Sequence, residues 1–390
     1  MKKVLFVATV SSHIKTFHLP FIKMLKKARI QTYVAAKWNL IDEHNLEDVD
    51  KFFDIAIKRQ PFSFYNFIAI KQLKEIIKKE KFNTIHCHTP MGGVVARMAA
   101  KSARKKYGTK VIYTAHGFHF YKGAPLLNWL LFFPVEWFLA KHTDVLITIN
   151  SEDYKTAKKF FAKRCHQIEK INGVGVDEKK YDSAISPSKR NKILKSLGLS
   201  QKDFIMIFPA RLDKNKNQGF LIDVMEDLVS RHKNIHLLLP GRDELNSYYQ
   251  KIVHKKKLDR NIHFLGYRND VFELQKISNI VVSSSLREGL PVNIIEALFA
   301  HKPAVVLNCR GMSDLIENGM NGQLIEIKDQ FKKQKFLDAI MDYYDGKVWK
   351  YPKTVCLKDF YTEQITNSLL DIYNIQKADM IDKIYGGDKK

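Results

Sequence analysis

Two glutamates, Glu288 and Glu296, lie eight positions apart in the stretch 283–300. The apolar run 279–282 predicts a strand, and a Gly-Leu-Pro turn then opens an apolar segment that predicts a helix, with Pro291 at its first position. Glu288 therefore stands in the loop, whereas Glu296 lies inside the helix, about two turns further along. Two carboxylates at two depths could hold two different sugars.

The start of this predicted helix is also suited to binding a phosphate or a diphosphate. A helix N-terminus presents backbone N–H groups without intrahelical partners, together with the positive end of the helix dipole. Pro291 has no N–H to donate, which leaves the N–H groups of Leu290, Val292 and Asn293, in the turn that Gly289 opens. We expect these residues to contact the phosphates of a donor.

Together, the strand, the turn and the two glutamates resemble the glutamate, seven residues, glutamate motif of retaining GT-B glycosyltransferases of family 4. The resemblance implies that Glu288 touches the donor sugar near its reacting carbon. It also implies that Glu296 accepts hydrogen bonds from the ribose hydroxyls of a nucleotide-sugar donor. The alternative for two glutamates at this spacing is a solvated helix face, because a charged chain contains many such pairs.

A cation is needed where negative charge builds on the departing diphosphate of such a donor. Arg211 ends the predicted strand 204–210, and Lys216 follows in a polar loop before a predicted helix at 218–231. The resemblance implies that both contact the diphosphate, since the family carries an arginine and a lysine at matching places. In a chain this basic, an arginine and a lysine five positions apart also occur by chance.

The segment 263–268 ends another predicted strand of the same half and includes Gly266, Tyr267 and Arg268. The resemblance implies that this loop meets the nucleotide base through backbone groups, with glycine allowing a close approach. An ordinary strand-to-helix turn accounts for the same residues.

In the first half of the chain, His116 follows a predicted strand that begins at Lys110, and Gly117 comes next. It resembles the histidine that family 4 enzymes place near the donor sugar, although a lone histidine is more often a satisfied polar group. The strings 86–93 and 114–125 resemble the subgroup that builds bacterial exopolysaccharide and capsule repeat units on a lipid carrier.

Further residues of this half are expected on the acceptor side, after the ends of predicted strands. They are His13, Phe17, His18, His119 and Lys122. Two places depart from the family pattern. The family often has a Gly-Gly pair where this chain has Ser11, Ser12 and His13, and a Gly-Gly-x-x-Glu sequence where this chain has 310–314, which ends in Asp314.

No metal and no nicotinamide cofactor are expected. His86 and His88 alternate along the predicted strand 84–87 and are therefore expected to face opposite sides, which argues against both binding one metal. The Asp-x-Asp run at 48–50 lies in a charged stretch and is expected to be a solvated face. The Gly-Val-Gly run at 173–175 lacks the third glycine of a dinucleotide-binding fingerprint.

Along the sequence that contains these candidate residues, short apolar runs alternate with longer stretches that have the periodicity of a helix. This alternation predicts parallel sheets with helices on both faces, whose ligands bind beyond the carboxyl ends of the strands. The predicted strands are 4–10, 30–36, 84–87, 110–115 and 144–149 in the first half, and 204–209, 235–240, 262–266, 280–283 and 304–307 in the second. The predicted helices include 18–27, 67–79, 218–231 and 247–257.

We therefore expect two doubly wound, Rossmann-like domains that face each other across a cleft, which is the GT-B architecture. The expected boundaries are an acceptor-side domain at 1–182, a linker at 183–200 and a nucleotide-sugar-binding domain at 201–360. A C-terminal helix at 361–376 could cross back to the first domain, and 377–390 is expected to be a tail.

The 390-residue chain carries a formal net charge of +24, and 45% of its residues are hydrophobic. This composition excludes a disordered chain and implies an acidic partner: a nucleic acid, an anionic membrane surface or a phosphorylated substrate. Lysine and arginine are spread over both halves, which disfavours a nucleic-acid-binding face. Four widely spaced cysteines without a Cys-x-x-Cys pair indicate a reduced cytosolic compartment.

The most apolar stretch, 126–140, is shorter than the roughly 20 residues that span a bilayer, and it contains Pro134 and Glu136. Its periodicity fits a core helix and a membrane-facing helix equally well. Trp129 and Trp137 favour the membrane surface, and an acceptor on a polyprenyl lipid would stay in the bilayer. We expect peripheral binding to the anionic inner face of the cell membrane.

The leading hypothesis is a retaining glycosyltransferase that moves a hexose or an N-acetylhexosamine from a UDP-sugar to a polyprenyl-diphosphate-linked saccharide. A nucleotide-sugar epimerase or a phosphorylase of the same fold is the alternative, since a fold does not fix its chemistry.

Overall fold

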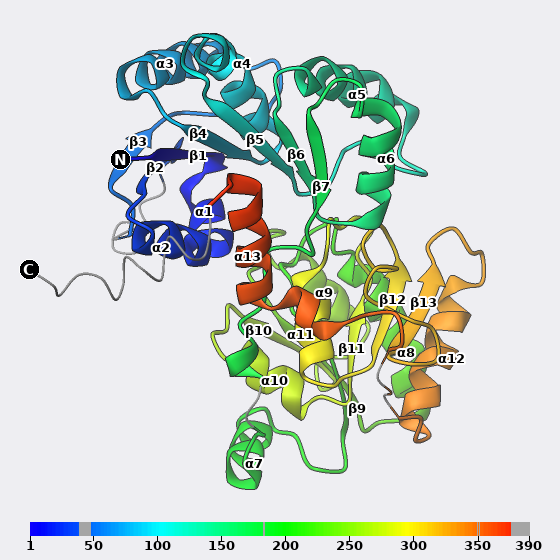
Figure 1. Cartoon of the computed structure of the whole chain (residues 1–390). Coiled ribbons are helices and arrows are strands. Elements are labelled where there is room, and N and C mark those ends of the chain that lie inside the picture. The colour runs from blue at the N-terminus through cyan, green and yellow to red at the C-terminus, as the bar shows by residue number, and fades with distance from the viewer. Residues whose placement is uncertain (39–47, 182–183, 349, 351, 376–390) are drawn as a thin grey trace, which may run out of the picture. The chain divides into compact units, whose positions relative to one another are not determined.

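The computed structural model describes residues 1–38, 48–181, 184–348, 350 and 352–375, and it divides the chain into two compact units. Unit 1 comprises Met1–Gly175 and the C-terminal segment from Thr362, and unit 2 comprises Val176–Tyr361. The chain thus leaves unit 1, builds unit 2 and returns to unit 1. Each unit contains its own parallel sheet (Figure 1).

The sheet of unit 1 has seven parallel strands in the order β3-β2-β1-β4-β5-β6-β7. Its inner strands are apolar and buried, as expected for a parallel sheet that helices cover on both faces. The register pairs Val4 of β1 with Thr32 of β2 and with Thr84 of β4. The strands are β1 (Lys3–Val10), β2 (Gln31–Lys37), β3 (Lys51–Asp54), β4 (Thr84–His88), β5 (Lys110–Ala115), β6 (Val145–Thr148) and β7 (Gln167–Lys170).

Helices cover both faces of this sheet (Figure 1). One face carries α3 (Phe64–Glu80), α4 (Pro90–Tyr107), α5 (Leu126–Ala140) and α6 (Ser151–Phe161), which share one apolar core with the strands. The other face carries α1 (Ser11–Phe17), α2 (Leu19–Lys27) and α13 (Thr362–Tyr373), and α2 contacts α13. The carboxyl ends of β1, β4 and β5 therefore lie side by side at one edge of the sheet.

The last described helix, α13, is fixed to the rest of unit 1 by polar contacts. The Tyr373 hydroxyl lies 2.8 Å from Nδ1 of the buried His86, whose Nε2 lies 2.8 Å from the Thr114 hydroxyl. The Lys110 ammonium donates to the Ile372 carbonyl at 2.6 Å. The C-terminal helix expected at 361–376 corresponds to α13, and the tail expected at 377–390 lies outside the described residues.

The sheet of unit 2 has six parallel strands in the order β10-β9-β8-β11-β12-β13, and α8, α9 and α12 share an apolar core with it. The strands are β8 (Phe204–Ile207), β9 (Ile235–Pro240), β10 (Ile262–Gly266), β11 (Ile280–Ser283), β12 (Ala304–Asn308) and β13 (Gly322–Glu326). The helices are α7 (Pro187–Ser196), α8 (Gln218–Arg231), α9 (Tyr248–Lys255), α10 (Val271–Ile277), α11 (Val292–Phe299) and α12 (Lys332–Tyr344), with short 3-10 turns at Glu178–Lys180 and Leu357–Phe360.

Three strands, β3, β7 and β13, have no counterpart among the predicted strands. Each lies at an edge of its sheet, and each is short and partly polar; β7, for example, reads Gln-Ile-Glu-Lys. An edge strand is covered less completely than a central one, so it does not need the continuous apolar run that reveals a buried strand.

Two further expectations differ from the observed elements. The helix expected at 18–27 corresponds to α2, with Pro20 in its first turn, where the missing N–H costs nothing. A separate helix that was not predicted, α1, precedes it, and His18 lies between the two. Residues 183–200, expected as a linker, fall within unit 2 and contain α7, whose first turn is capped by the Ser186 hydroxyl. A polar helix without an apolar stripe gives little periodic signal.

Candidate active site

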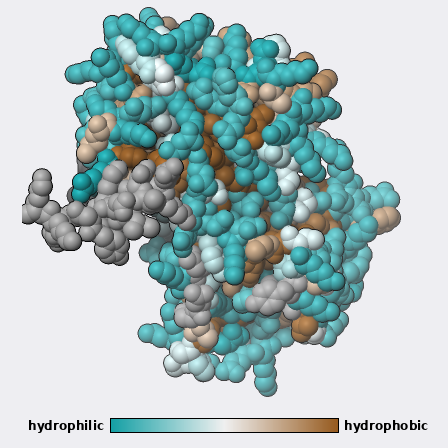
Figure 2. Space-filling view, viewed as in Figure 1, coloured by the Kyte–Doolittle hydropathy of each residue, from teal (hydrophilic) through white to brown (hydrophobic). Residues whose placement is uncertain are grey.

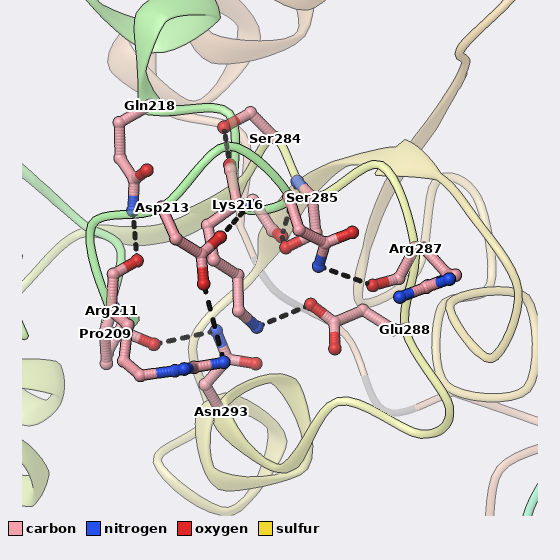
Figure 3. Close-up of polar contacts among 12 residues, drawn as sticks. Pro209, Arg211, Asp213, Lys216, Gln218, Ser284, Ser285, Arg287, Glu288 and Asn293 are labelled. Carbon is pink, nitrogen blue, oxygen red and sulfur yellow. Dashed lines mark hydrogen bonds and ion pairs between the residues drawn. The ribbon is translucent and has the colours of Figure 1, made fainter. Parts of the chain in front are cut away.

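The centre of the candidate site in unit 2 is an ion pair between Lys216 and Glu288 (Figure 3). The Lys216 ammonium donates to Oε1 of Glu288 at 2.6 Å, and both side chains are mostly buried, with exposed fractions of 17% and 14%. The two residues follow β8 and β11, which are neighbours in the sheet. Because these two strands are parallel, a cation and a carboxylate lie side by side at the carboxyl edge of the sheet, where ligands of such sheets bind.

Backbone and side-chain hydrogen bonds hold the two loops together. The N–H of Leu286 donates to the Asn215 carbonyl at 2.8 Å, and the Asn215 amide donates to the Arg287 carbonyl at 2.9 Å. The Ser284 hydroxyl lies within hydrogen-bond distance of the Lys216 carbonyl, at 2.8 Å (Figure 3). Neither Asn215 nor Ser284 is part of a motif that the sequence analysis identified. Asn215 lies in the segment of Arg211 and Lys216, and Ser284 lies in the segment of the two glutamates.

A third loop, which follows β12, packs against the backbone of the Glu288 loop. Arg310 is almost fully buried, and its Nε donates to the Glu288 carbonyl at 3.0 Å. Gly311 has a φ of +81°, and a Cβ at this position would lie 2.2 Å from the Gly289 carbonyl oxygen. The segment 310–314 thus positions the Glu288 loop, and the sequence marked it only as a departure from the family pattern.

Gly311→Ala is expected to disturb this support and lower activity without unfolding unit 2. The new methyl group would force the backbone of residues 289–290 to move, and alanine is also strained at this φ. We expect turnover to fall at least about tenfold and the melting temperature to fall by a few degrees. Steady-state kinetics and thermal unfolding measure both, and Gly346→Ala is a matched control, because its φ is +106° but no atom lies within 4 Å of the added Cβ. Equal effects of the two substitutions would show that strain alone, and not the contact with the Glu288 loop, is responsible.

The helix after Glu288, α11, begins at Val292, so Pro291 is the N-cap residue and not the first helical residue as predicted. A cap residue has extended backbone angles, and the ψ of Pro291 is 109°. The Asn293 amide donates to the Pro209 carbonyl at 3.1 Å, which fixes the start of α11 beside the end of β8 (Figure 3). The first N–H groups of α11 have no acceptors within the helix and lie at the same edge as Lys216.

Arg211 does not join the Lys216–Glu288 pair. Its guanidinium is 56% exposed, donates to the Glu244 carboxylate at 2.7 Å and lies 3.5 Å from the Asp213 carboxylate. The Arg211 carbonyl accepts a hydrogen bond from the side chain of Gln218, so its backbone is fixed although its side chain is exposed (Figure 3).

Glu296, the second carboxylate of the motif, lies deeper than Glu288. Burial raises the pKa of Glu296 to about 7, whereas a hydrogen bond from the Tyr181 hydroxyl and the charge of Lys180 oppose this rise. Tyr181 is buried, and its ring packs on Phe272 and Phe299. Tyr181 has no signal in the sequence that connects it with Glu296.

The predicted base-binding loop presents one exposed aromatic ring. Tyr267 is exposed, and the guanidinium of Arg242 lies 4.9 Å from the centre of its ring. Gly266 has a φ of +62°, and its carbonyl accepts the N–H of Gly241 at 2.7 Å. Arg268 is paired with the Asp270 carboxylate. The exposed ring of this loop is therefore that of Tyr267, and the cation beside it, Arg242, comes from the segment after β9.

A cluster of histidines lies at the carboxyl edge of the sheet in unit 1. Among the described residues, His13, His18, His88 and His116 have ring nitrogens that all lie within 4.8 Å of one another. Nε2 of His116 is 3.3 Å from Nε2 of His13 and 3.4 Å from Nδ1 of His88. Burial lowers the pKa of His13 to about 4 and lowers the pKa values of His88 and His116 well below the ordinary range. These imidazoles are therefore neutral at physiological pH.

The expectation that His86 and His88 face opposite sides is wrong. Their ring centres are 4.1 Å apart, on the same side of β4. Successive side chains of a strand alternate between the two faces, so residues two positions apart share a face. His86 nevertheless turns its nitrogens toward Tyr373 and Thr114, away from the other four histidines.

Neutral imidazoles are also zinc ligands, so the fit of this cluster to a metal matters. The rings of His18 and His88 are stacked, with centres 3.8 Å apart and planes tilted by 30°. Two stacked imidazoles direct their in-plane lone pairs side by side and not toward one point. The observed ring arrangement therefore does not form a tetrahedral four-histidine centre.

The other residues predicted for the acceptor side are divided between two places. Phe17 joins the histidine cluster, with its ring centre 5.1 Å from that of His13. His119 packs on Phe132 of α5, with ring centres 4.5 Å apart. The backbone N–H of Lys122 donates to the Glu152 carboxylate at 2.7 Å. His119 and Lys122 thus belong to the segment that leads into α5.

Helix α5 combines a core-facing side with an exposed apolar side. Trp129 and Phe133 pack against the core of unit 1, whereas Leu127 and Leu130 are 62% and 64% exposed. Trp137 is also exposed, with the Arg164 guanidinium 3.3 Å from its ring centre. Among the described helices, none is long and apolar enough to cross a membrane.

Comparisons with known proteins connect this arrangement with a family. Residues 189–349 match the family described as "Glycosyl transferases group 1", and residues 3–150 match "Glycosyl transferase 4-like". The chain is 41% identical to the putative glycosyltransferase EpsD of Bacillus subtilis (strain 168), over 84% of each chain. It is 27% identical to an Escherichia coli UDP-Gal:alpha-D-GlcNAc-diphosphoundecaprenol alpha-1,3-galactosyltransferase, over 87% of this chain and 83% of that one.

The crystal structure of Anabaena HepE in complex with UDP and glucose has the same fold, with a TM-score of 0.69 at 20% identity over 96% of this chain and 100% of that one. The predicted fold class, two doubly wound parallel α/β units of the GT-B type, is confirmed. The chain belongs to the glycosyl transferases group 1, which is family 4, and is a glycosyltransferase.

Proposed function

We propose that this chain is a retaining enzyme that transfers a hexose or an N-acetylhexosamine from a UDP-sugar to a saccharide on a polyprenyl diphosphate, in exopolysaccharide or capsule synthesis. The observation that carries the proposal is the Lys216–Glu288 pair beside the N-terminus of α11. The Escherichia coli relative, an enzyme named for UDP-galactose and a diphosphoundecaprenol-linked sugar, supports the choice of donor and acceptor. The UDP complex of HepE also supports the donor.

The donor side of the reaction needs charges of both signs. Cleavage of the anomeric C–O bond leaves positive charge on the sugar ring and negative charge on the departing UDP. The Glu288 carboxylate stabilises the ring cation, while the Lys216 ammonium and the first N–H groups of α11 stabilise the diphosphate. Arg211 would add to this once its exposed side chain turns from Glu244 to the phosphates. No metal is required in this scheme.

The remaining donor contacts serve binding. The Glu296 carboxylate accepts hydrogen bonds from the ribose hydroxyls, in place of the Tyr181 hydroxyl. Tyr267 offers an aromatic face to the uracil base, beside Gly266. Gly289, Leu290, Val292 and Asn293 line the phosphate end.

On the acceptor side, we assign the histidine cluster of unit 1 to the sugar and diphosphate groups. Neutral imidazoles can donate or accept a hydrogen bond according to their tautomer, so they suit sugar hydroxyls. His116 is the member that we assign to the transferred sugar, and His13, Phe17 and His18 are assigned to the acceptor.

The test is release of UDP from a panel of UDP-sugars with polyprenyl-diphosphate-linked saccharides, in the presence of EDTA. We expect release only when donor and acceptor are both present, and no loss of activity with the chelator. Conversion of a UDP-sugar without an acceptor would support an epimerase instead. Strict dependence on added manganese would contradict charge stabilisation by Lys216 and α11.

The raised pKa of Glu296 predicts a pH dependence of donor binding. Below pH 7 the carboxyl group is protonated and above it is ionised, and only the ionised form makes charge-assisted hydrogen bonds to ribose. The KM for the UDP-sugar should therefore rise about fivefold between pH 8 and pH 5.5, while turnover changes less. Glu296→Gln should bind the donor weakly with no such pH dependence. The same slope in wild type and variant would assign the titration to another group.

A further inference from the structure

An apolar groove lies on unit 1 between α3, α4 and α5, on the face of the sheet that these helices cover. Its volume is about 410 Å³. Met91, Val94, Val95 and Met98 form its floor, at the spacing of one face of α4, and the walls come from α3 and α5. The groove therefore follows α4 for about 10 Å, from the first turn of the helix onward.

The groove offers no free hydrogen-bonding side chain. Asn66 is its one polar lining residue, and both ends of the Asn66 amide are already used. Its oxygen accepts the N–H of Lys58 at 2.8 Å, and its nitrogen donates to the Gln60 carbonyl at 2.9 Å. A sugar or a phosphate would find no hydrogen-bond partner among these side chains. A hydrocarbon chain needs none and would therefore lose no hydrogen bond on entering the groove.

A buried ion pair joins two of the helices that form the groove. Arg97 of α4 and Glu136 of α5 form it at 2.8 Å, and the Arg97 guanidinium lies 3.9 Å from the ring centre of Tyr113. Arg97 also donates to the Gly93 carbonyl within its own helix. Separating these partners would leave a buried charge without compensation, so the pair fixes α5 to α4 beside the groove.

The groove opens where most of the exposed large hydrophobic side chains of the described residues lie. Thirteen of the nineteen exposed large hydrophobic side chains lie on α3, α4, α5 or the turn before α3. Hydrophobic atoms reach the surface along the edge that α5 forms, although most of the face in view is hydrophilic (Figure 2). Apolar areas of this extent on a monomer mark an interaction site.

Cations border this area, which favours a lipid surface over a second copy of the chain. Lys141 lies 4.2 Å from the ring centre of Phe138, Lys58 lies 5.4 Å from that of Tyr65, and Arg164 covers Trp137. Aromatic rings with adjoining lysine and arginine suit the boundary of an anionic bilayer. Two copies, each with a net charge of +24, would repel each other.

We propose that the groove binds the isoprenoid chain of the lipid-linked acceptor. This rests on the proposed function, which supplies an acceptor with such a chain. The groove and the histidine cluster begin at the same carboxyl edge of the sheet, because Met91 stands three residues after His88, where β4 leads into α4. The histidine rings lie on the face that α2 and α13 cover and the groove on the other face, so a long lipid chain would pass around this edge. The methionines at both ends adapt to the irregular outline of a methyl-branched chain. The groove thus selects the lipid, while the histidines contact the polar groups.

Filling the groove tests this assignment. Met98→Trp and Val94→Phe should raise the KM for a saccharide on a long polyprenyl diphosphate about tenfold, as expected for losing contact with about two methylene-sized groups. The same saccharide diphosphate on a short alkyl chain should keep its KM. Phe331→Trp, at an exposed apolar position of unit 2, is the control and should change neither value. An equal rise for both acceptors, or no rise for either, would overturn the proposal.

Flotation with anionic vesicles separates the groove from general membrane contact. The groove-filling variants should float like wild type, whereas Leu127→Ser with Leu130→Ser should float less. Both leucines are exposed, whereas Trp129 of the same helix packs in the core, so a substitution of Trp129 would destabilise the fold. Reduced flotation of Met98→Trp would mean that the groove is simply part of the membrane-contacting surface.

A photoreactive polyprenyl diphosphate without any sugar provides a readout that does not depend on transfer. It should label residues 91–98 in wild type and fail to label Met98→Trp, and thermal unfolding should show that both proteins are folded. If residues 91–98 are labelled but no UDP release is seen with any acceptor, the groove would still be a binding site for the lipid, and the proposed transfer reaction would be rejected. Equal labelling of 91–98 by a photoreactive phospholipid would show that the groove does not distinguish the acceptor lipid.

Discussion

Replacing Glu288 with glutamine is expected to lower turnover by about 10³-fold, while the chain stays folded and still binds UDP. The substitution keeps the size of the side chain and removes the negative charge that we assign to stabilising the sugar ring cation. Charge that develops in a transition state gains the most from a fixed countercharge in a site with little water, so the loss falls on turnover. Steady-state kinetics and UDP binding by calorimetry measure the two effects separately.

A matched control distinguishes the site from the general effect of losing a Lys–Glu pair. Glu226 and Lys256 form such a pair in unit 2, but Glu226 is exposed and lies on α8, about 12 Å along the helix from its first residue, Gln218. Glu226→Gln should leave turnover unchanged, since exposed ion pairs contribute little. If Glu288→Gln keeps near-normal turnover, the carboxylate that acts on the donor sugar lies elsewhere.

Lys216→Ala is expected to lower turnover by about 10²–10³-fold with a smaller change in the KM for the donor. The negative charge on the departing diphosphate grows toward the transition state, so a fixed ammonium stabilises that state more than the bound donor. The variant also leaves the Glu288 carboxylate without the partner that lies 2.6 Å away in the intact protein. Part of the loss could therefore come from a misplaced Glu288.

The double variant Lys216→Ala with Glu288→Gln separates the two causes. Residues that act as one unit give losses that do not add, so the double variant should be only slightly slower than the slower single variant. Lys216→Arg should recover part of the activity, because it keeps the charge. Fully additive losses would mean that the two groups act independently, and a loss confined to UDP affinity would limit Lys216 to ground-state binding.

The sequence alone predicts where chemistry is located along the chain, because strand ends and turns are local features. The alternation of apolar runs and helical patterns is sufficient for two doubly wound parallel sheets, and Lys216 and Glu288 each stand after a predicted strand. Short edge strands such as β7 escape this reasoning, since a strand with an uncovered side does not need a continuous apolar run. Periodicity predicts helices and strands but not the chemical role of a residue, so the expected roles of Lys216 and Glu288 came from the family resemblance.

Contacts between distant residues were decided only by the tertiary structure. Lys216 and Glu288 are 72 positions apart and meet because β8 and β11 are neighbours, an order that no local pattern specifies. The ionisation of Glu296 depends on burial beside Tyr181, and burial is a property of packing. Helix α5 is apolar nearly all round, so its periodicity could not separate the core side at Trp129 from the exposed side at Leu127. That division was fixed by the partners available on each side, because the same apolar residues are stable in a protein core and at a lipid surface.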